Sequence, residues 1–314
     1  MEIYPLKFKP VYKEKIWGGR NLHRLFGRDL PEDKKIGESW ELADLPNGQS
    51  VVSNGVHEGK TLNEVTNSLG VQLMGKAATL PDGRFPLLLK LLDANDRLSL
   101  QVHPDEKAAQ EIPGAELKTE CWFMVESRGG YIYKGVRKGV TPAEFRHAIE
   151  TDSCEDVVRR IDCETGDFHY LPAGTVHAIG PGLVVAEVQT PSDTTYRVTD
   201  WGRGREIHVD RSMECIRFDL TGDEVPGAEG DCLLVTDYFT VFDRTIAAGS
   251  ESTVRESTCA AMMMLSGTVQ IQAEGIDPVE AGSGDTVLLP AALEPTLSAE
   301  SDARFLFVTL PEKS

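Results

Sequence analysis

The sequence predicts a mainly β protein with a few peripheral helices. Apolar and polar residues alternate at positions 98–103 and 268–273 and at the end of the segment 183–189, and a short apolar run occupies positions 86–92. Alternation is typical of antiparallel strands with one buried face, because successive side chains of a strand point to opposite sides. Gly, Pro and Asp residues separate these runs, as expected of turns between strands.

Helical patterns are fewer than strand patterns. They occupy residues 62–73, 105–111 and 141–161. The last begins with Thr141, Pro142 and Glu144, a combination that predicts a helix N-cap, a proline in the first turn and the glutamate of a capping box.

Composition and charge exclude several classes of protein. The chain has 314 residues, 40% of them hydrophobic, which is enough for one large domain or two modest ones. Its formal charge of −18 disfavours nucleic-acid and membrane-surface partners, because both surfaces are anionic. The sequence has neither a signal-peptide pattern nor an apolar run long enough to span a bilayer.

Cysteine usage predicts a reducing compartment. The six cysteines form no CxxC pair, and six in a chain of this length do not make a disulfide scaffold. We therefore expect free thiols and a cytoplasmic protein; the oligomeric state stays open. The cysteines are Cys121, Cys154, Cys163, Cys215, Cys232 and Cys259.

A weak internal repeat indicates two related β-modules. Residues 166–174 resemble residues 284–292, and residues 121–130 resemble residues 259–268. The two separations, 118 and 138 positions, differ by 20, which is about the length of the predicted 141–161 helix. A helical insertion in the first module accounts for that difference.

The first copy of the repeat resembles the second motif of the cupin family, whose members are jelly-roll β-sandwiches. The pattern Gly-Asp…Pro-x-Gly-x-x-His ends at His177, and the resemblance implies a metal ligand there. Pro295 occupies the equivalent position in the second copy and cannot bind a metal. We therefore expect a catalytic cupin module over residues 1–228 and a degenerate one without metal ligands over residues 229–314.

Strand geometry selects candidate metal ligands. On the strand 98–103, the polar residues Ser99, Gln101 and His103 share one face, and aliphatic residues occupy the other. Such a polar face is costly to bury unless it lines a polar cavity. Lys118 and Glu120 repeat this spacing on the following segment.

Two imidazoles, one carboxylate and one amide oxygen together suit a zinc ion that keeps a position open for water or substrate. Other divalent metals also accept such nitrogen and oxygen ligands. A dication with one carboxylate leaves a charge of +1, which favours an anionic ligand. The remaining five histidines fit no such pattern and are expected to be solvated or hydrogen-bonded structural groups. The four candidate ligands are Gln101, His103, Glu120 and His177.

Several motifs in a fixed order resemble type I mannose-6-phosphate isomerases, in the short bacterial form without the extra helical domain of longer relatives. The resemblance extends from about residue 5 to about residue 215, and the rest matches only loosely, as a degenerate second cupin. The motifs lie at positions 16–19, 86–90, 98–105, 118–120 and 193–197.

This resemblance implies a zinc-dependent aldose–ketose isomerase, with one ion per chain held by the same four ligands and a small sugar phosphate as the partner. Mannose 6-phosphate and fructose 6-phosphate would interconvert by proton transfer through a cis-enediol. Arg197 would be an active-site cation, and Glu187 and Lys118 are both candidates for the base. Lys90 and Ser99 would lie near the substrate phosphate, and Arg203 and Arg205 are further cations close to these motifs.

Two alternatives remain from other functional classes. A non-catalytic sugar-phosphate-binding cupin would be expected to have lost a metal ligand or Arg197, and neither is missing. An iron-dependent cupin oxygenase uses two histidines and a carboxylate with open positions for dioxygen. In this chain Gln101 would occupy one of the coordination positions needed for dioxygen, and an oxygenase mechanism gives Lys118 and Arg197 no evident role.

Overall fold

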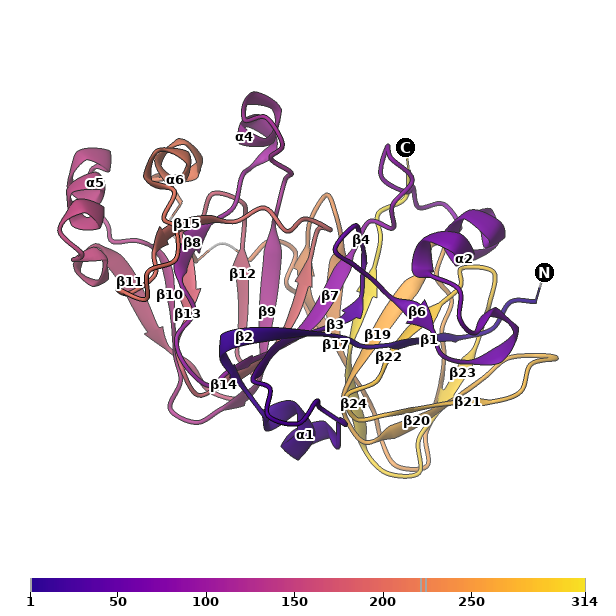
Figure 1. Cartoon of the computed structure of the whole chain (residues 1–314). Helices are drawn as coiled ribbons and strands as arrows, with labels where there is room; N and C mark the ends of the chain where they lie inside the picture. The colour runs from indigo at the N-terminus through magenta and orange to yellow at the C-terminus, as the bar shows by residue number, and fades with distance from the viewer. Residues whose placement is uncertain (1, 221, 224, 314) are drawn as a thin grey trace.

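Four stacked β-sheets with short helices at their ends make up the protein (Figure 1). The structure, a computed structural model, describes residues 2–220, 222–223 and 225–313. The sheets follow one another in the order five-, six-, seven- and four-stranded, which forms two sandwiches packed back to back. The prediction of a mainly β, cupin-like fold is confirmed.

The first sandwich contains the five- and six-stranded sheets, in which every strand pairing is antiparallel among the described residues. The five-stranded sheet comprises, in spatial order, β11 (Val158–Asp162), β10 (Tyr131–Val136), β13 (His177–Ile179), β8 (Leu100–Val102) and β15 (Tyr196–Thr199). The six-stranded sheet comprises β12 (Phe168–Leu171), β9 (Glu120–Ser127), β14 (Leu183–Gln189), β7 (Leu88–Ala94), β3 (Ile36–Leu42) and β2 (Val11–Gly19).

The second sandwich contains the seven- and four-stranded sheets. The seven-stranded sheet comprises β16 (Cys232–Val235), β17 (Thr240–Ile246), β24 (Ala303–Thr309), β19 (Ala260–Ser266), β22 (Thr286–Leu289), β1 (Leu6–Lys9) and β6 (Val51–Val52). The four-stranded sheet comprises β18 (Glu251–Thr253), β23 (Thr296–Ser298), β20 (Thr268–Gln272) and β21 (Val279–Gly282). A separate ribbon pairs β4 (Asp44–Leu45) with β5 (Gly48–Gln49).

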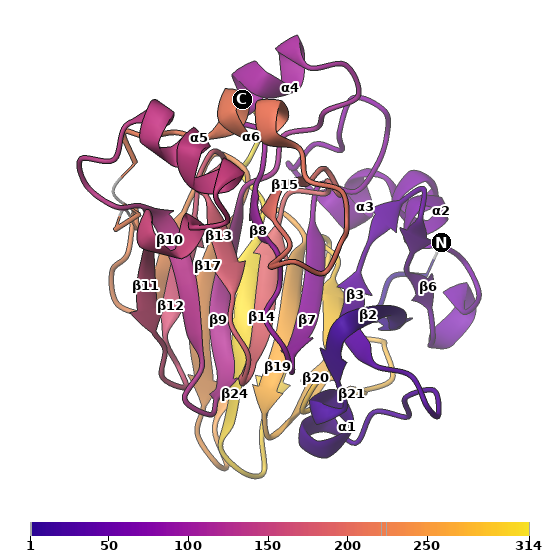
Figure 2. The same cartoon turned by 60° about the vertical axis from the view of Figure 1, so that its left-hand side comes forward.

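The helices are short and lie outside the sheets. Figure 2 shows α4, α5 and α6 together at one end of the first sandwich. The helices are α1 (Asn21–Phe26), α2 (Leu62–Leu69), α3 (Val71–Met74), α4 (Glu106–Glu111), α5 (Pro142–Glu150) and α6 (Val209–Cys215), with 3₁₀ turns η1 (Gly55–His57) and η2 (Cys154–Asp156).

Because successive side chains of a strand point to opposite sides, one strand can contribute residues to two hydrophobic cores. On β9, Cys121 and Phe123 lie in the large core between the six- and seven-stranded sheets. Trp122 and Met124 point the other way, into the core of the first sandwich. The β9 strand therefore has two buried faces, as expected for a strand in the middle of a layered protein.

The internal repeat corresponds to equivalent strands in the two sandwiches. β9 pairs with β12 as β19 pairs with β22. Met124 exchanges two main-chain hydrogen bonds with the turn 166–167, and Met264 does the same with the turn 284–285. Between these strands, β20 leads to β21 directly, whereas α5 and η2 separate β10 from β11. The predicted helical insertion therefore lies inside a hairpin.

Three sequence predictions differ from the structure at element ends. The helix predicted over 141–161 has the expected capping box at Thr141 but stops at Glu150, and the edge strand β11 follows, because its residues find a partner in β10. The helix predicted over 62–73 is interrupted at Gly70, which has a φ of 53°. The strand 98–103 is reduced to Leu100–Val102.

The N-terminal segment contributes to the sheet of the C-terminal strands. β1 pairs with β22 on one side and with β6 on the other, so β22 gains a partner from the opposite end of the chain. The division into modules at residues 228 and 229 stays a prediction. If this division is correct, strands β1 and β6 of the first module complete the seven-stranded sheet of the second.

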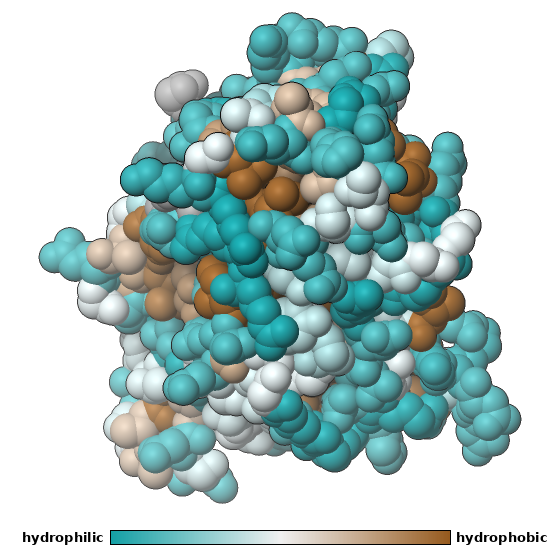
Figure 3. All heavy atoms as spheres, turned by 90° about the vertical axis from the view of Figure 1, so that its left-hand side faces the viewer, coloured by the Kyte–Doolittle hydropathy of each residue, from teal (hydrophilic) through white to brown (hydrophobic). Residues whose placement is uncertain are grey.

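The described residues include no helix that is both long and apolar enough to cross a membrane. All six cysteines are free thiols, and five of them are buried. The face in Figure 3 is largely hydrophilic, with small separated hydrophobic patches, which agrees with the high charge of the chain.

Deleting residues 229–314 should yield insoluble protein. The deletion exposes the apolar face of the six-stranded sheet that packs against Met263, Leu288 and Leu306, and it removes the β22 partner of β1. Expression of the truncated chain followed by sedimentation would test this, with a chain shortened only by the exposed residues 311–313 and Ser314 as the soluble control. A soluble and active truncation would contradict it.

Candidate metal centre and adjoining cavity

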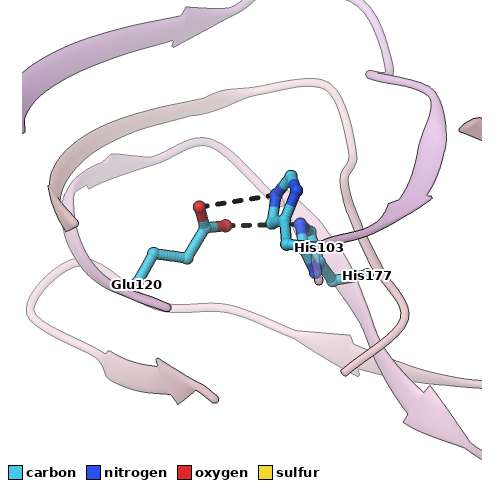
Figure 4. Close-up of side chains that lie close together, drawn as sticks. All are labelled: His103, Glu120 and His177. Atoms are coloured by element: carbon cyan, nitrogen blue, oxygen red, sulfur yellow. Dashed lines mark ion pairs between the residues drawn. The ribbon is translucent and has the colours of Figure 1, made fainter. Parts of the chain in front are cut away.

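Two histidines and a glutamate meet inside the first sandwich (Figure 4). His103 follows β8 and His177 begins β13, its neighbour in the five-stranded sheet, whereas Glu120 begins β9 in the facing six-stranded sheet. The Glu120 carboxylate lies 3.3 Å from His177 Nε2 and 3.6 Å from His103 Nε2. All three side chains are buried.

Main-chain carbonyls fix the tautomer of both rings. His103 Nδ1 lies 2.9 Å from the carbonyl oxygen of Thr194, and His177 Nδ1 lies 2.8 Å from that of Thr175. Since a carbonyl only accepts, each Nδ1 carries the hydrogen and each Nε2 presents a lone pair. Burial lowers the pKa of both imidazoles, to about 4 for His177, so neither is charged near neutral pH.

The lone pairs therefore face the Glu120 carboxyl group, which in its ionised form cannot donate to them. His103 Nε2 and both oxygens of Glu120 are buried and accept no hydrogen bond from the part of the chain that the structure describes, although the Lys118 ammonium forms an ion pair with Glu120 Oε2. Buried polar atoms in native proteins are almost always partnered, so a cation fits this point better than a hydrogen bond does. Two imidazoles and a carboxylate are donors that suit zinc and similar dications.

Gln101 completes the predicted set of four. Its side-chain nitrogen lies 3.3 Å from His177 Nε2, and its register partner on β13 is His177. Exchanging the amide nitrogen and oxygen directs the oxygen to the same point, and the two orientations are distinguished only by their surroundings. The structure thus brings Gln101 together with the other three residues; its role as a ligand stays a prediction.

Lys118 borders this cluster. Its ammonium lies 3.2 Å from Glu120 Oε2. Burial raises the pKa of Glu120 to about 7, although Lys118 opposes the rise. A single lysine therefore does not fully compensate the buried carboxylate.

A cavity of about 320 Å³ adjoins the cluster. Gln101 and Lys118 line it, which connects the two histidines and Glu120 to the open space. Its lining contains five basic and three acidic side chains, an excess of positive charge in a chain whose total charge is −18. The basic residues are Lys15, Lys90, Lys118, Arg197 and Arg205, and the acidic ones are Glu38, Glu187 and Asp193.

Glu187 lies on the cavity wall with both carboxylate oxygens engaged. Lys90 Nζ lies 2.8 Å from Oε1, and Trp122 Nε1 donates to Oε2 at 2.9 Å. Burial alone would raise the pKa of Glu187, but Lys90 and Lys118 outweigh it and lower the pKa. The carboxylate is therefore ionised and fixed in orientation.

Lys90 is held by the protein rather than left free. Besides Glu187, its ammonium donates to Gln189 Oε1 at 2.6 Å. Burial alone would lower the pKa of Lys90, but Glu187 and Glu38 outweigh burial and raise it. Lys90 and Ser99 both line the cavity, and their contact with a phosphate stays a prediction.

The three candidate arginines differ in their partners. Arg197 lines the cavity, with Nη1 donating to the carbonyl oxygen of Glu206 at 2.6 Å, and its Nε is buried without a hydrogen-bond acceptor. Arg203 and Arg205 both bind the carboxylate of Asp200. Arg203 is absent from the cavity lining, so the structure does not place it among the cavity cations.

Sequence analysis did not find Lys15 and Glu38, which lie on β2 and β3 and also line the cavity. Their ammonium and carboxylate groups are 2.8 Å apart. Burial would raise the pKa of Glu38, but Lys90 and Lys15 outweigh it and lower the pKa to about 2. The strand pattern alone gave no signal for them, because the pairing of β3 with β7 brings Glu38 to the cavity.

Glu38→Gln should weaken the pH dependence of stability in acid. The folded pKa of Glu38, about 2, lies below the value of 4.5 expected for the unfolded chain. Ionised Glu38 therefore stabilises the folded state above pH 4.5, and this contribution is lost as the pH falls toward 2. Denaturant titrations of both proteins over this range should differ in slope by up to about 1 kcal/mol per pH unit. Equal slopes would contradict the shift, and Glu14→Gln, at an exposed pair with Lys34, is the matched control.

The chain is similar to one enzyme family in sequence and structure. Residues 5–124 match the family described as phosphomannose isomerase type I, catalytic domain. The probable mannose-6-phosphate isomerase GmuF of Bacillus subtilis is 37% identical over 92% of this chain and 94% of that protein. The mannose-6-phosphate isomerase of Streptococcus mutans is 35% identical over 92% and 93%. The crystal structure of a Bacillus subtilis mannose 6-phosphate isomerase matches with a TM-score of 0.87 and 31% identity, over 98% of this chain and 99% of that one.

Proposed function

The chain belongs to the type I phosphomannose isomerases, and from that premise we propose that it interconverts mannose 6-phosphate and fructose 6-phosphate in a zinc-dependent reaction. The observation that supports the metal is the set of buried acceptors on His103 and Glu120, which face one another and accept no hydrogen bond from the described residues. Gln101, His103, Glu120 and His177 would hold the ion, with one ion per chain.

The positive cavity supports a dianionic substrate. A phosphate needs charged or polar donors, and Arg197 offers a buried Nε without an acceptor. Ser99 lies on the same wall and would add a neutral donor. Lys90 would act mainly by holding Glu187, because its ammonium already contacts Glu187 and Gln189.

The isomerisation transfers a proton between C1 and C2 of the open-chain sugar through a cis-enediol. When bound, zinc would stabilise the negative charge that develops on the sugar oxygen. Arg197, the register partner of Gln101 on the neighbouring strand β15, would add further positive charge to the cavity. Lys118 Nζ and the Glu187 carboxylate are the two groups that could accept the carbon-bound proton, and both line the cavity.

Free buried thiols support the further proposal of a cytoplasmic location, where thiols stay reduced. Two alternatives to the isomerase remain, a non-catalytic cupin that binds sugar phosphates and an iron-dependent oxygenase. The chelation experiment gives a different outcome for each of them.

Chelation should abolish the conversion of mannose 6-phosphate to fructose 6-phosphate, and zinc should restore it. The measurement is a coupled assay on protein before chelation, after chelation and after addition of Zn²⁺. Activity that persists in protein shown to be metal-free would contradict the proposal. Zinc-loaded protein that binds the sugar phosphate without turnover would support the binding protein, and oxygen uptake with iron would support the oxygenase.

Comparison of Lys118→Met with Glu187→Gln should identify which of the two residues is the catalytic base and which only positions it. Loss of a general base typically lowers kcat by about 10²- to 10⁴-fold. The variant that lacks the base should also stop exchange of the substrate C2 hydrogen with deuterium from solvent, measured by NMR. Arg197→Lys keeps the charge but changes its reach, so we expect a higher KM with exchange retained. Near-normal exchange in both Lys118→Met and Glu187→Gln would exclude the two candidates.

A further inference from the structure

A second cluster of metal-binding side chains lies apart from the centre described above. The Cys163 Sγ atom is 3.6 Å from His169 Nε2. These two atoms and a carboxylate oxygen of Asp167 all lie within 4.8 Å of one another. Sequence analysis treated Cys163 as a free thiol and found no pattern around His169, because a Cys-x₃-Asp-x-His spacing has meaning only once the chain has folded.

The local fold explains why the three side chains meet. Asp167 directly precedes β12 and His169 is its second residue, so the two side chains, two positions apart, lie on the same side of the chain. His169 is paired with Trp122 of β9, whose side chain lies in the core of the first sandwich. Cys163 comes directly after β11 and lies in the same core. The loop from β11 to β12 thus folds the thiol back onto the imidazole.

We propose that Cys163, Asp167 and His169 form a second metal site, for a zinc-like transition-metal dication. Thiolate, imidazole and carboxylate are ligands that zinc and cobalt(II) accept, and four-coordinate sites combine three such ligands with a water. Cys163 is buried, whereas Asp167 and His169 are partly exposed, so water can reach the fourth position. The site is independent of the isomerase proposal.

The surroundings favour the imidazole and carboxylate ligands, whereas burial raises the pKa of the Cys163 thiol to about 12, so the metal must displace the thiol proton. The amide of Glu164 donates to Asp167 Oδ2 at 2.7 Å and so orients the carboxylate. Burial lowers the pKa of His169 to about 4, which keeps the imidazole neutral. On binding, the Cys163 S–H bond breaks, the sulfur donates to the metal and the proton passes to solvent, with no change of oxidation state. Thiolate and carboxylate then balance the dication, which limits its repulsion by the nearby Lys134.

The position of the cluster suggests what the metal does. β11 and β12 are the edge strands of the two sheets of the first sandwich, and Figure 2 shows them at the same side of the molecule. A metal held by the end of one strand and the start of the other would tie the two sheets together at their open edge. The centre at Glu120 lies between other strand ends of the same sandwich.

Cobalt(II) distinguishes the two sites, because a cobalt–thiolate bond absorbs in the near ultraviolet and nitrogen and oxygen ligands alone do not. Metal-free full-length protein would be titrated with Co²⁺ while its absorption spectrum and bound-metal content are measured. We expect two ions per chain and a near-ultraviolet band. Cys163→Ser and His169→Phe should each bind one ion fewer, and Cys163→Ser should lose the band.

Cys215→Ser is the matched control, since Cys215 is another buried thiol, on α6. It should keep the band and both ions. The proposal is overturned if the wild-type protein shows no band, or if the band survives Cys163→Ser, because the contact with His169 is then an ordinary thiol–imidazole hydrogen bond. Thermal melts of the variants establish that they are folded, and if Cys163→Ser is unstable, one ion fewer in folded His169→Phe decides the question.

Discussion

The Glu120 carboxylate imposes the main constraint on this structure. It lies in the protein interior opposite the lone pairs of two neutral imidazoles, and only Lys118 brings a positive charge within 3.2 Å. Such a carboxylate is costly to bury without a compensating cation. The carbonyls of Thr175 and Thr194 maintain this arrangement, because they hold the hydrogens of both rings on the far side from Glu120. The side chains around Glu120 therefore compensate its negative charge only in part.

The same strands that bear the site also attach the second sandwich. Glu187 and Lys90 point into the cavity, whereas their neighbours Val188 and Leu91 point into the core shared with the seven-stranded sheet. A residue that faces the cavity is therefore positioned by apolar packing on the opposite side of its own strand. The C-terminal strands therefore stabilise the strands that bear the site. They can do so without a metal ligand of their own, since Pro295 occupies the position in the repeat that corresponds to His177.

The residues predicted as metal ligands lie close together in the structure, and the sequence patterns that predicted them are local; their binding of a metal stays a prediction. Strand alternation is sufficient to put Gln101 and His103 on one side of their strand, and the structure brings Glu120 to them from the facing sheet. Sequence reasoning failed where long-range pairing decides. Residues 158–161 were predicted as helix but form a strand against β10. Glu38 enters the cavity through the pairing of β3 with β7, which no local pattern records.

One loop connects the metal centre to the charged wall of the cavity. Gln189 accepts a hydrogen bond from Lys90 and donates to the carbonyls of Thr190 and Ser192. Two residues further on, the carbonyl of Thr194 orients His103, and the chain then enters β15, which contains Arg197. A shift of this loop would therefore change the orientation of a ligand and the place of a cation together. Because the net charge of the chain repels anions at long range, the proposed sugar phosphate would have to be retained by such short-range contacts, and their common support on this loop would couple the position of the phosphate to that of the proposed metal.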